Sequence, residues 1–358
     1  MSIIDRYIQK TVLLSIVVAM ILTASVDMVF TMAEELGDTG DTYSSLQALV
    51  FVFRTLPTGI YELLPYSALF GALFGLGILA SNNELVVIQA AGVATWRIVW
   101  STMKPTLLII AAGLILGEYI APQLEQQAQS DKAVQQSGGG AIGSSLGTWQ
   151  KIGNEFIHIN AIVPGGENLI GVTRYRLNEN RQLVSSSFAE SAQYVRRDNQ
   201  GYWLLSNIAE TIIATTGVAT QNYREQNWAV GLSPELLSVL LVEPQRQSIS
   251  GLYRFARYFE SEGLEADSYF LASWKKLFQP LSTAALVLLA ISFVFGPLRE
   301  ATTGYRLFIA IAIGLVFTIV QSLLEPASLL YGFSPIIAVL MPVLISAILG
   351  CLLLRRIR

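Results

Sequence analysis

Six long apolar segments, arranged as two groups of three, are the feature that most constrains this chain. Each has about 18 to 24 residues, enough for a helix rising 1.5 Å per residue to cross a hydrocarbon core of roughly 30 Å. The segments are residues 11–33, 63–80, 98–121, 277–295, 307–324 and 333–354. A long polar stretch separates the third from the fourth. The pattern predicts a polytopic α-helical membrane protein, three helices on each side of an inserted water-exposed domain.

Composition supports a membrane protein and argues against several other classes. Hydrophobic residues make up 53% of the chain and charged residues 14%, with a mean hydropathy of +0.51, which is atypical of a soluble globular protein. The net charge of −3, without a basic patch, predicts no nucleic-acid partner. The single cysteine, Cys351, lies in the last apolar segment, so the polar domain has no disulfide. The first segment lacks a small-residue cleavage pattern and is interpreted as a retained helix.

The lysine and arginine distribution predicts the orientation, since these residues favour the cytoplasmic side. With a cytoplasmic N-terminus, that side carries Arg6, Lys10, Arg97, Lys104, Arg299, Arg306, Arg355, Arg356 and Arg358. The short loops on the other side offer Arg54 alone and several acids. Lys275 and Lys276, at the outer end of the fourth segment, are exceptions. We expect both termini on the cytoplasmic side of the membrane and the polar domain on the opposite side.

The polar domain reads as β-strands followed by one helix. In residues 155–163 apolar and polar side chains alternate, and further short runs are separated by Pro, Gly, Asn and Asp clusters. This pattern predicts an all-β sandwich or jelly roll. Residues 249–262 change to a helical period and predict an amphipathic helix. The predicted domains are residues 1–122, with three membrane helices, 123–265, with the jelly roll and this helix, and 266–358, with the other three.

No catalytic or metal-binding constellation is visible in the sequence. The one histidine, His158, has no carboxylate or cysteine placed to make it a base or ligand and is interpreted as an ordinary strand residue. Gly138 and Gly143 have P-loop spacing, but Ser144 stands where the phosphate-binding lysine is needed. We therefore interpret this stretch as a connector. No cofactor is expected in this chain, and any ATP and Mg would be bound by another.

Polar and small residues inside the apolar segments suggest local roles. Gly71 and Gly75 have GxxxG spacing and predict close helix packing, either within the chain or with another subunit. Asp27 lies near the outer end of the first segment, where it either reaches interfacial water or takes part in proton coupling. Asp27→Asn would abolish activity under the second hypothesis.

The loop between the second and third segments gives the sharpest local signal. Ser81 followed by Glu84 predicts a capping box that opens a short helix over residues 81–92. Leu85, Ile88 and Gln89 follow at helical spacing, and Gly92 can end the helix. Such a helix between two membrane segments suits contact with an ATPase, with Glu84 pairing an arginine of the partner. The alternative is that Glu84 only caps its own helix.

Eight short strings together resemble one family of membrane proteins. They are DRYI at 5–8, ELVVIQAAG at 84–92, GEYIAPQ at 117–123, LNENR at 177–181, SISGL at 248–252, FQPLS at 278–282, FGPLR at 295–299 and YGFSPIIAVLMP at 331–342. In this order and spacing the chain resembles the lipopolysaccharide export permeases, the LptF/LptG family, with the LptG branch the more similar. The resemblance covers nearly the whole chain.

The resemblance implies the permease subunit of an ABC exporter in a bacterial inner membrane, with the polar domain in the periplasm. In this family LptF and LptG pair above two LptB ATPase subunits and extract lipopolysaccharide, which periplasmic jelly rolls pass to LptC and to the LptA bridge. The resemblance places Glu84 in the coupling helix and Lys132 among the cations near the lipid phosphates. This chain departs from the family in the acidic outer end of its first segment. Arg54, Lys132, the partner subunit or divalent ions remain alternative sources of positive charge there.

Apolar membrane walls are consistent with a lipid substrate. The last three segments hold almost no charge, and Gln321 is the most polar residue within the fifth, which makes it a candidate lipid contact. Two other classes stay open. A secondary transporter would need inverted repeats and broken helices near the bilayer centre. A non-transporting envelope scaffold would explain the β domain but would give the 81–92 helix no role.

Overall fold

The computed structural model divides the chain into two compact units. The helical unit comprises Met1–Phe30, Leu56–Pro122 and Gln247–Arg358, and the sheet unit comprises Thr31–Thr55 and Gln123–Arg246. The structure describes residues 3–40, 43–137, 148–163, 166–178, 180–197, 200–214, 217–230, 233–234, 237, 243–261, 266–298 and 301–356. The Gly138–Ser145 stretch, Arg299 and Arg358 lie outside these residues.

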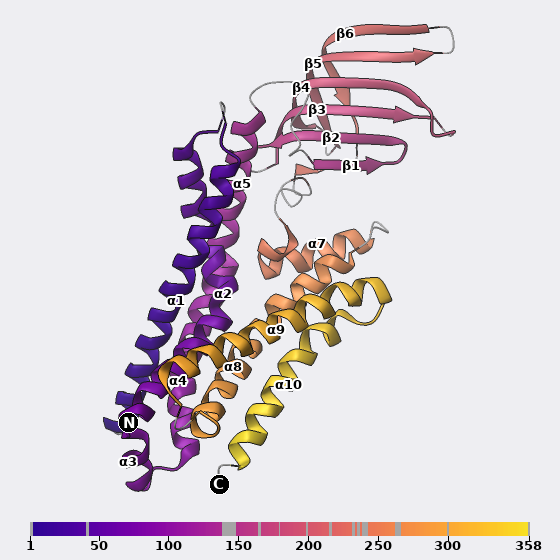
Figure 1. The fold of residues 1–358 in the computed structure, drawn as a ribbon. Coiled ribbons are helices and arrows are strands. Elements are labelled where there is room, and N and C mark those ends of the chain that lie inside the picture. The colour runs from indigo at the N-terminus through magenta and orange to yellow at the C-terminus, as the bar shows by residue number, and fades with distance from the viewer. Residues whose placement is uncertain are drawn as a thin grey trace. The chain divides into compact units, whose positions relative to one another are not determined.

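Helices account for most of the described chain (Figure 1). They are α1 (Ile3–Gly37), α2 (Ser45–Ser81), α3 (Glu84–Ala90), α4 (Thr95–Ile115), the π-helix η1 (Leu116–Ile120), α5 (Ala121–Ser137), the 3₁₀ turn η2 (Pro244–Arg246), α7 (Ile249–Ser261), α8 (Asp267–Phe295), α9 (Thr303–Tyr331) and α10 (Pro335–Arg356). Within the described residues, six helices are long and apolar enough to cross a membrane, the third being the continuous run Thr95–Gln136. The six predicted spans are confirmed, and each helix extends beyond its apolar segment at one end or both.

Two glycines bring α1 and α2 into close contact. A Cβ at Gly71 would overlap the backbone of Ile16, and a Cβ at Gly75 would lie 3.1 Å from Cα of Val12. Only hydrogen at these positions allows the two backbones to approach so closely. The GxxxG prediction is confirmed as packing within the chain. The helical core continues through fully buried residues of both helices, including Ile16 of α1 and Leu69 and Leu73 of α2.

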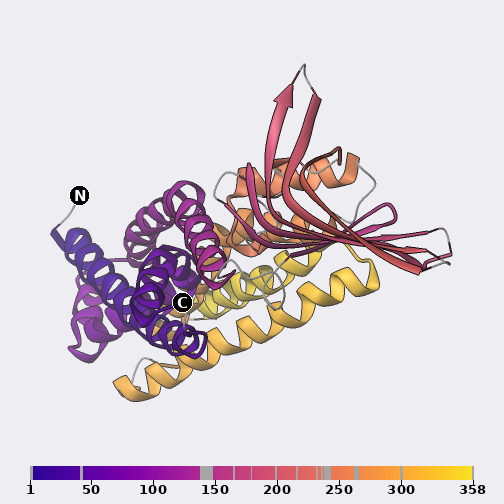
Figure 2. The same cartoon turned by 90° about the horizontal axis from the view of Figure 1, so that it is seen from above.

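The inserted domain is built on one antiparallel sheet. Its strands are β1 (Thr148–Ile152), β2 (Glu155–Ile162), β3 (Asn168–Leu177), β4 (Leu183–Arg197), β5 (Gln200–Ala214) and β6 (Gly217–Trp228). The strand order is β1-β2-β3-β4-β5-β6, and the sheet is strongly twisted (Figure 2). The all-β prediction is therefore confirmed. Each described strand pairs with its sequence neighbours as in a meander, whereas a jelly roll also pairs strands distant in sequence.

Alternation in the sequence decides which face of the sheet is buried. Ile157 and Ile159 on β2 are fully buried and pack with Trp203 of β5 in the core of this unit. Their neighbour His158 points to the other face, where it pairs in register with Trp149 of β1. The face of β2 that carries Ile157 and Ile159 is therefore the buried one.

Candidate functional site

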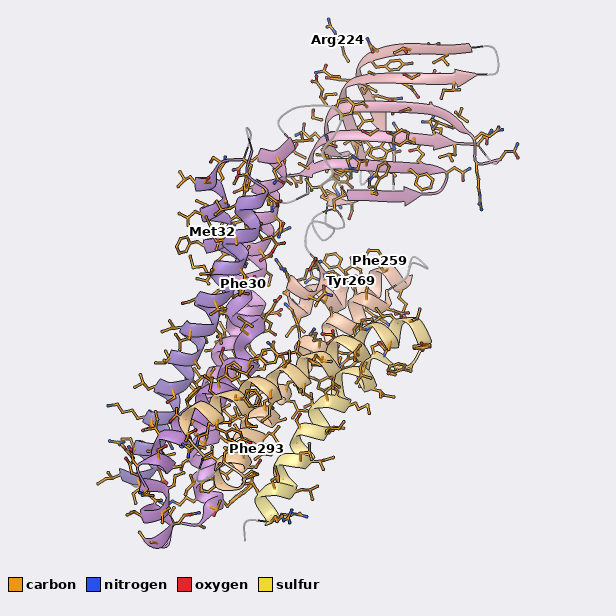
Figure 3. All side chains as sticks on the ribbon, viewed as in Figure 1. Phe30, Met32, Arg224, Phe259, Tyr269 and Phe293 are labelled. Atoms are coloured by element: carbon orange, nitrogen blue, oxygen red, sulfur yellow. The ribbon has the colours of Figure 1, made fainter. Side chains whose placement is uncertain are left out.

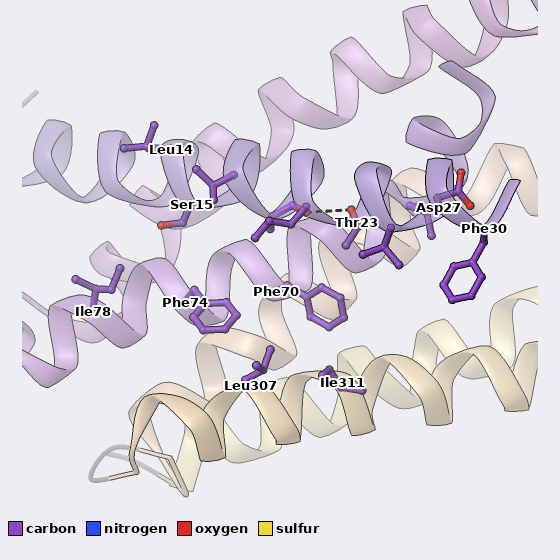
Figure 4. Close-up of a pocket in the computed structure, with 15 residues that line it drawn as sticks. Leu14, Ser15, Thr23, Asp27, Phe30, Phe70, Phe74, Ile78, Leu307 and Ile311 are labelled. Carbon is purple, nitrogen blue, oxygen red and sulfur yellow. Dashed lines mark hydrogen bonds between the residues drawn. The ribbon is translucent and has the colours of Figure 1, made fainter. Parts of the chain in front are cut away.

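An apolar pocket of about 840 Å³ opens between α1, α2 and α9 in the helical unit (Figure 4). Its fifteen lining residues are Leu14, Ser15, Val18, Ala19, Leu22, Thr23, Val26, Asp27, Phe30, Leu63, Phe70, Phe74, Ile78, Leu307 and Ile311. Three of the fifteen are polar. Ser15 is half-buried, and the hydroxyls of Thr23 and Ser67, on α1 and α2, lie 2.7 Å apart in a hydrogen bond. The wall is therefore suited to hydrocarbon, with few groups to hold water.

Asp27 lines one end of this pocket beside Phe30 (Figure 4). It is half-buried, which agrees with a residue near the end of an apolar helix. Whether its carboxylate takes part in proton coupling stays a prediction. Gln321, the polar residue of α9, is buried and does not line the pocket. Its proposed contact with lipid also stays a prediction.

The capping box predicted at Ser81 is wrong. Ser81 is the last residue of α2, and its hydroxyl donates to the carbonyl oxygen of Gly77 at 2.8 Å. Helix α3 begins at Glu84 after Asn83, whose φ of 61° is left-handed and whose side chain makes no cap hydrogen bond. The Glu84 carboxylate accepts from Nδ2 of Asn82 at 3.2 Å. Glu84 therefore does not reach back to cap Ser81.

Helix α3 buries one face and exposes the other. Leu85 and Ile88 pack into the core of the helical unit, so they hold α3 to its own chain. Val86 and Val87 are exposed, Val87 to 66%, and the sequence reading did not single them out. Gly92, at a φ of 85°, follows the end of the helix as predicted. Val86 and Val87 therefore form an apolar pair that this chain does not cover and that a partner protein can contact.

Two of the cations proposed for lipid phosphates are paired with acids in the sheet unit. Nζ of Lys132 lies 2.7 Å from Glu35 and 2.9 Å from Asp38, and 4.9 Å from the Phe51 ring centre. Arg54 forms an ion pair with Asp131. The acidic outer end of the first segment, a departure from the family pattern, therefore neutralises Lys132.

The tyrosine beside this cluster has a shifted pKa. Tyr43 donates to Glu35 at 3.0 Å. Burial, together with the negative charge of Glu35, raises the pKa of Tyr43 well above its usual value. The tyrosine is therefore a neutral donor at any physiological pH. It helps to fix Glu35 against Lys132.

A second polar cluster surrounds the start of α7. The carboxylate of Glu118, in the π-helix, accepts from the backbone N–H of Ile249 at 2.8 Å and of Ser250 at 3.2 Å. Lys276 of α8 is buried, donates to the carbonyl of Gln247 and lies 5.1 Å from the Tyr61 ring centre. Near the other end of α7, the Phe259 ring stacks on that of Tyr269 of α8, with ring centres 4.9 Å apart (Figure 3). Helix α7 is therefore bound to the membrane helices at both ends.

The titratable groups of the sheet make structural contacts. His158 lies 4.7 Å from the ring of Trp149, and burial lowers its pKa although a hydrogen bond with Asn160 opposes the shift. Burial alone would raise the pKa of Glu155, but hydrogen bonds from Arg174 and Arg176 lower it below its usual value. Among the described residues, no group of three or more His, Cys, Asp or Glu could hold a metal.

These features define a class of protein. A chain with six helices long and apolar enough to cross a membrane, an apolar pocket among them and an inserted β domain is a multi-pass membrane protein. A family model described as "Lipopolysaccharide export system permease LptF/LptG" matches residues 6–356. The chain belongs to this family.

Curated relatives agree over nearly the full length. The chain is 35% identical to the lipopolysaccharide export system permease protein LptG of Escherichia coli (strain K12), over 95% of this chain and 94% of the relative. It is 32% identical to the protein of the same name from Haemophilus influenzae, over 99% and 98%. The resemblance drawn from short sequence strings is confirmed.

Proposed function

We propose that this chain is the transmembrane permease subunit of an ABC exporter that extracts lipopolysaccharide from the inner membrane and passes it to a periplasmic bridge. The apolar pocket of about 840 Å³ is the observation that carries the proposal. Each buried CH₂ of an acyl chain is worth about 0.8 kcal/mol, so walls of this kind favour lipid chains. The matched relatives carry export permease in their names.

The energy for extraction comes from a separate ATPase, the LptB dimer. Removing acyl chains from an apolar environment is uphill by the same 0.8 kcal/mol or so per CH₂, so an external source is needed. Helix α3 is the contact with this ATPase, with Val86 and Val87 as its exposed apolar pair and Glu84 at its start. ATP and Mg are bound by the ATPase, and this chain takes no cofactor of its own.

The remaining partners follow from the family. A sister permease, LptF, completes the pathway, and the sheet domain faces the periplasm, where it meets LptC and LptA. Both termini lie in the cytoplasm, as the arginines at the end of α10 and the position of α3 support. A secondary transporter or an envelope scaffold is the alternative.

The first test is purification of the tagged chain at native expression level in mild detergent, with mass spectrometry of the proteins that accompany it. Recovery of a nucleotide-binding subunit and a second six-helix permease supports the exporter. Recovery of the chain without an ATPase contradicts the exporter and supports the envelope scaffold or the secondary transporter instead.

The second test asks whether lipid enters the pocket. A photo-crosslinking amino acid at Phe70, which lines the pocket, is compared with one at Leu344, which is exposed on α10 and does not line it. In membranes, adducts with lipopolysaccharide are expected at Phe70 and to decrease when the complex hydrolyses ATP. Equal adducts at both positions would count against a specific lipid site.

A further inference from the structure

Arg306 is a buried charged side chain that the proposed function has not used. It lies in the first turn of α9 and is 2% exposed. Its Nη1 donates to the carbonyl oxygen of Gly77 and to Oγ of Ser81 at 2.7 Å, and its Nε donates to the carbonyl oxygen of Leu298 at 3.2 Å. One guanidinium therefore holds together the end of α2, the turn after α8 and the start of α9.

The end of α2 is built to receive this side chain. Gly77 has no Cβ, and one placed there would lie 3.1 Å from Nη1 and 3.2 Å from Cδ of Arg306. The carbonyl of Gly77 belongs to the last turn of α2, where the helix dipole favours a cation. Ser81 completes the acceptor, with its hydroxyl donating to Gly77 while it accepts from Arg306.

The two helices joined by Arg306 are also two walls of the apolar pocket. Ile78, next to Gly77, lines the pocket from α2, and Leu307, next to Arg306, lines it from α9 (Figure 4). The contact thus sits at one end of the pocket. It fixes the separation of α2 and α9 at that end.

The same end of α2 leads directly into α3. Between Ser81 and Glu84 there are two residues, and backbone hydrogen bonds from Asn82 and Asn83 to Ile78 and Ala80 continue the turn. A displacement of α3 is therefore passed to Gly77 and Ser81 through a short, hydrogen-bonded connection. Since the guanidinium is planar and binds two acceptors of this turn from fixed directions, it follows the turn more strictly than a lysine would.

We infer that Arg306 is a positioning residue that transmits movement of α3 to α9 and so couples ATP hydrolysis to the width of the lipid pocket. The inference rests on the proposed function. It adds the route by which movement at the ATPase contact on α3 is transmitted to α9, one wall of the pocket. Arg306 itself contacts neither ATP nor lipid in this scheme.

The test measures ATP hydrolysis and lipopolysaccharide release together in the reconstituted complete complex. For Arg306→Met we expect ATP hydrolysis to remain within about twofold, while release per ATP falls about tenfold, the effect of losing hydrogen bonds to a charged group. Arg306→Lys restores part of this ratio, because one donor direction survives. Ser81→Ala gives a smaller loss in the same ratio and covers the case in which Arg306→Met does not fold. The control Arg355→Met alters an exposed arginine at the end of α10 and keeps the normal ratio.

The outcomes separate this inference from the proposed function. Release per ATP that stays normal in both Arg306→Met and Ser81→Ala overturns the inference. A parallel loss of both activities in the folded Arg306→Met complex also overturns it, because a purely structural role gives that result. If the unmodified complex shows no ATP-driven release of lipopolysaccharide, the proposed function itself fails.

Discussion

Helix α2 has two neighbours along the apolar pocket and contacts them in opposite ways. Toward α1 it presents Gly71 and Gly75, so that backbone lies against backbone. Toward α9 it presents long side chains, with the Tyr66 and Phe317 rings 6.5 Å apart and the Thr318 hydroxyl donating to that of Tyr66 at 3.0 Å. The first contact leaves no room for sliding. Away from the Arg306 end, the second contact can change by rotation of side chains. We therefore expect α1 and α2 to move as one body, and α9 to pivot against them about the Arg306 contact.

The largest effect is expected where the α1–α2 contact is broken. Gly71→Leu puts a branched side chain against the backbone of Ile16 and should destabilise the protein by about 3 kcal/mol, the upper end of overpacking costs. The thermal unfolding midpoint and the yield of monodisperse protein in detergent measure this loss. Gly304→Leu is the matched control, since nothing lies within 4 Å of a Cβ there. Equal behaviour of the two variants would show that the close packing does not matter.

Chemical crosslinks sharpen the comparison between the two interfaces. In a background with Cys351→Ser, the pair Thr23→Cys and Ser67→Cys joins α1 to α2, where the native hydroxyls lie 2.7 Å apart. The pair Tyr66→Cys and Gly314→Cys, closed with a short bifunctional thiol reagent, joins α2 to α9. We expect the second crosslink to reduce lipopolysaccharide release at least about tenfold, as a block on pocket-wall motion would. The first should leave release nearly unchanged. The reverse result would place the moving wall at α1.

The smallest effect tests one hydrogen bond at the movable interface. Tyr66→Phe removes the acceptor of the Thr318 hydroxyl, which also donates to the carbonyl of Gly314 at 2.9 Å and so keeps a partner. The expected cost is therefore at most about 1 kcal/mol in unfolding free energy, with release within about twofold of normal. Tyr66→Ala, which also removes the ring contact with Phe317, should cost more. A large effect of Tyr66→Phe would mean that this interface is fixed by polar contacts.

In the sheet unit, the contacts of Glu155 predict how the stability of the protein depends on pH. The pKa of Glu155 is lower in the folded state than its usual 4.5, because Arg174 and Arg176 hydrogen-bond to the carboxylate. Its contribution to stability is therefore complete above about pH 4.5 and is lost as the pH falls through the lowered folded pKa. In Glu155→Gln, the free energy of unfolding should depend less on pH in this range. Tryptophan fluorescence followed during acid unfolding measures the difference. An unchanged acid transition in the variant would exclude this pair as its cause.

The sequence was sufficient for the elements that rest on local pattern. Long apolar runs located six helices, alternation in residues 155–163 located β2 with its buried face, and Gly71 with Gly75 indicated close packing. Strand β6 was not identified, because nearly all of its residues are exposed and its two faces do not alternate. Local periodicity carries no signal for such a strand.

The hydrogen-bond and ion-pair partners of several polar residues could not be predicted, because those partners are distant in the sequence. The Ser81 hydroxyl had two possible uses, as a cap for α3 or as a donor to the Gly77 carbonyl within α2. In the second position it also accepts from Arg306, 225 positions away, which the local sequence does not reveal. Arg306 was counted only as an inside charge, although an arginine in the first turn of an apolar helix could have been singled out. Lys132 has the chemistry of a phosphate ligand, and the sequence did not reveal that Glu35 and Asp38 pair with it in the folded chain. Its contact with lipid phosphates stays a prediction.

The cap that Glu118 provides for α7 has a consequence for synthesis of the protein. The 13-residue α7 is too short to be stable alone, and the carboxylate that binds its first N–H groups is 131 positions earlier in the chain. The N-terminal helices leave the ribosome first, so Glu118 is in place before residue 249 is made. The order of translation thus supplies the binding site for α7 ahead of α7 itself. A circular permutant that begins after Glu118 would have to form α7 without it until the last residues were added.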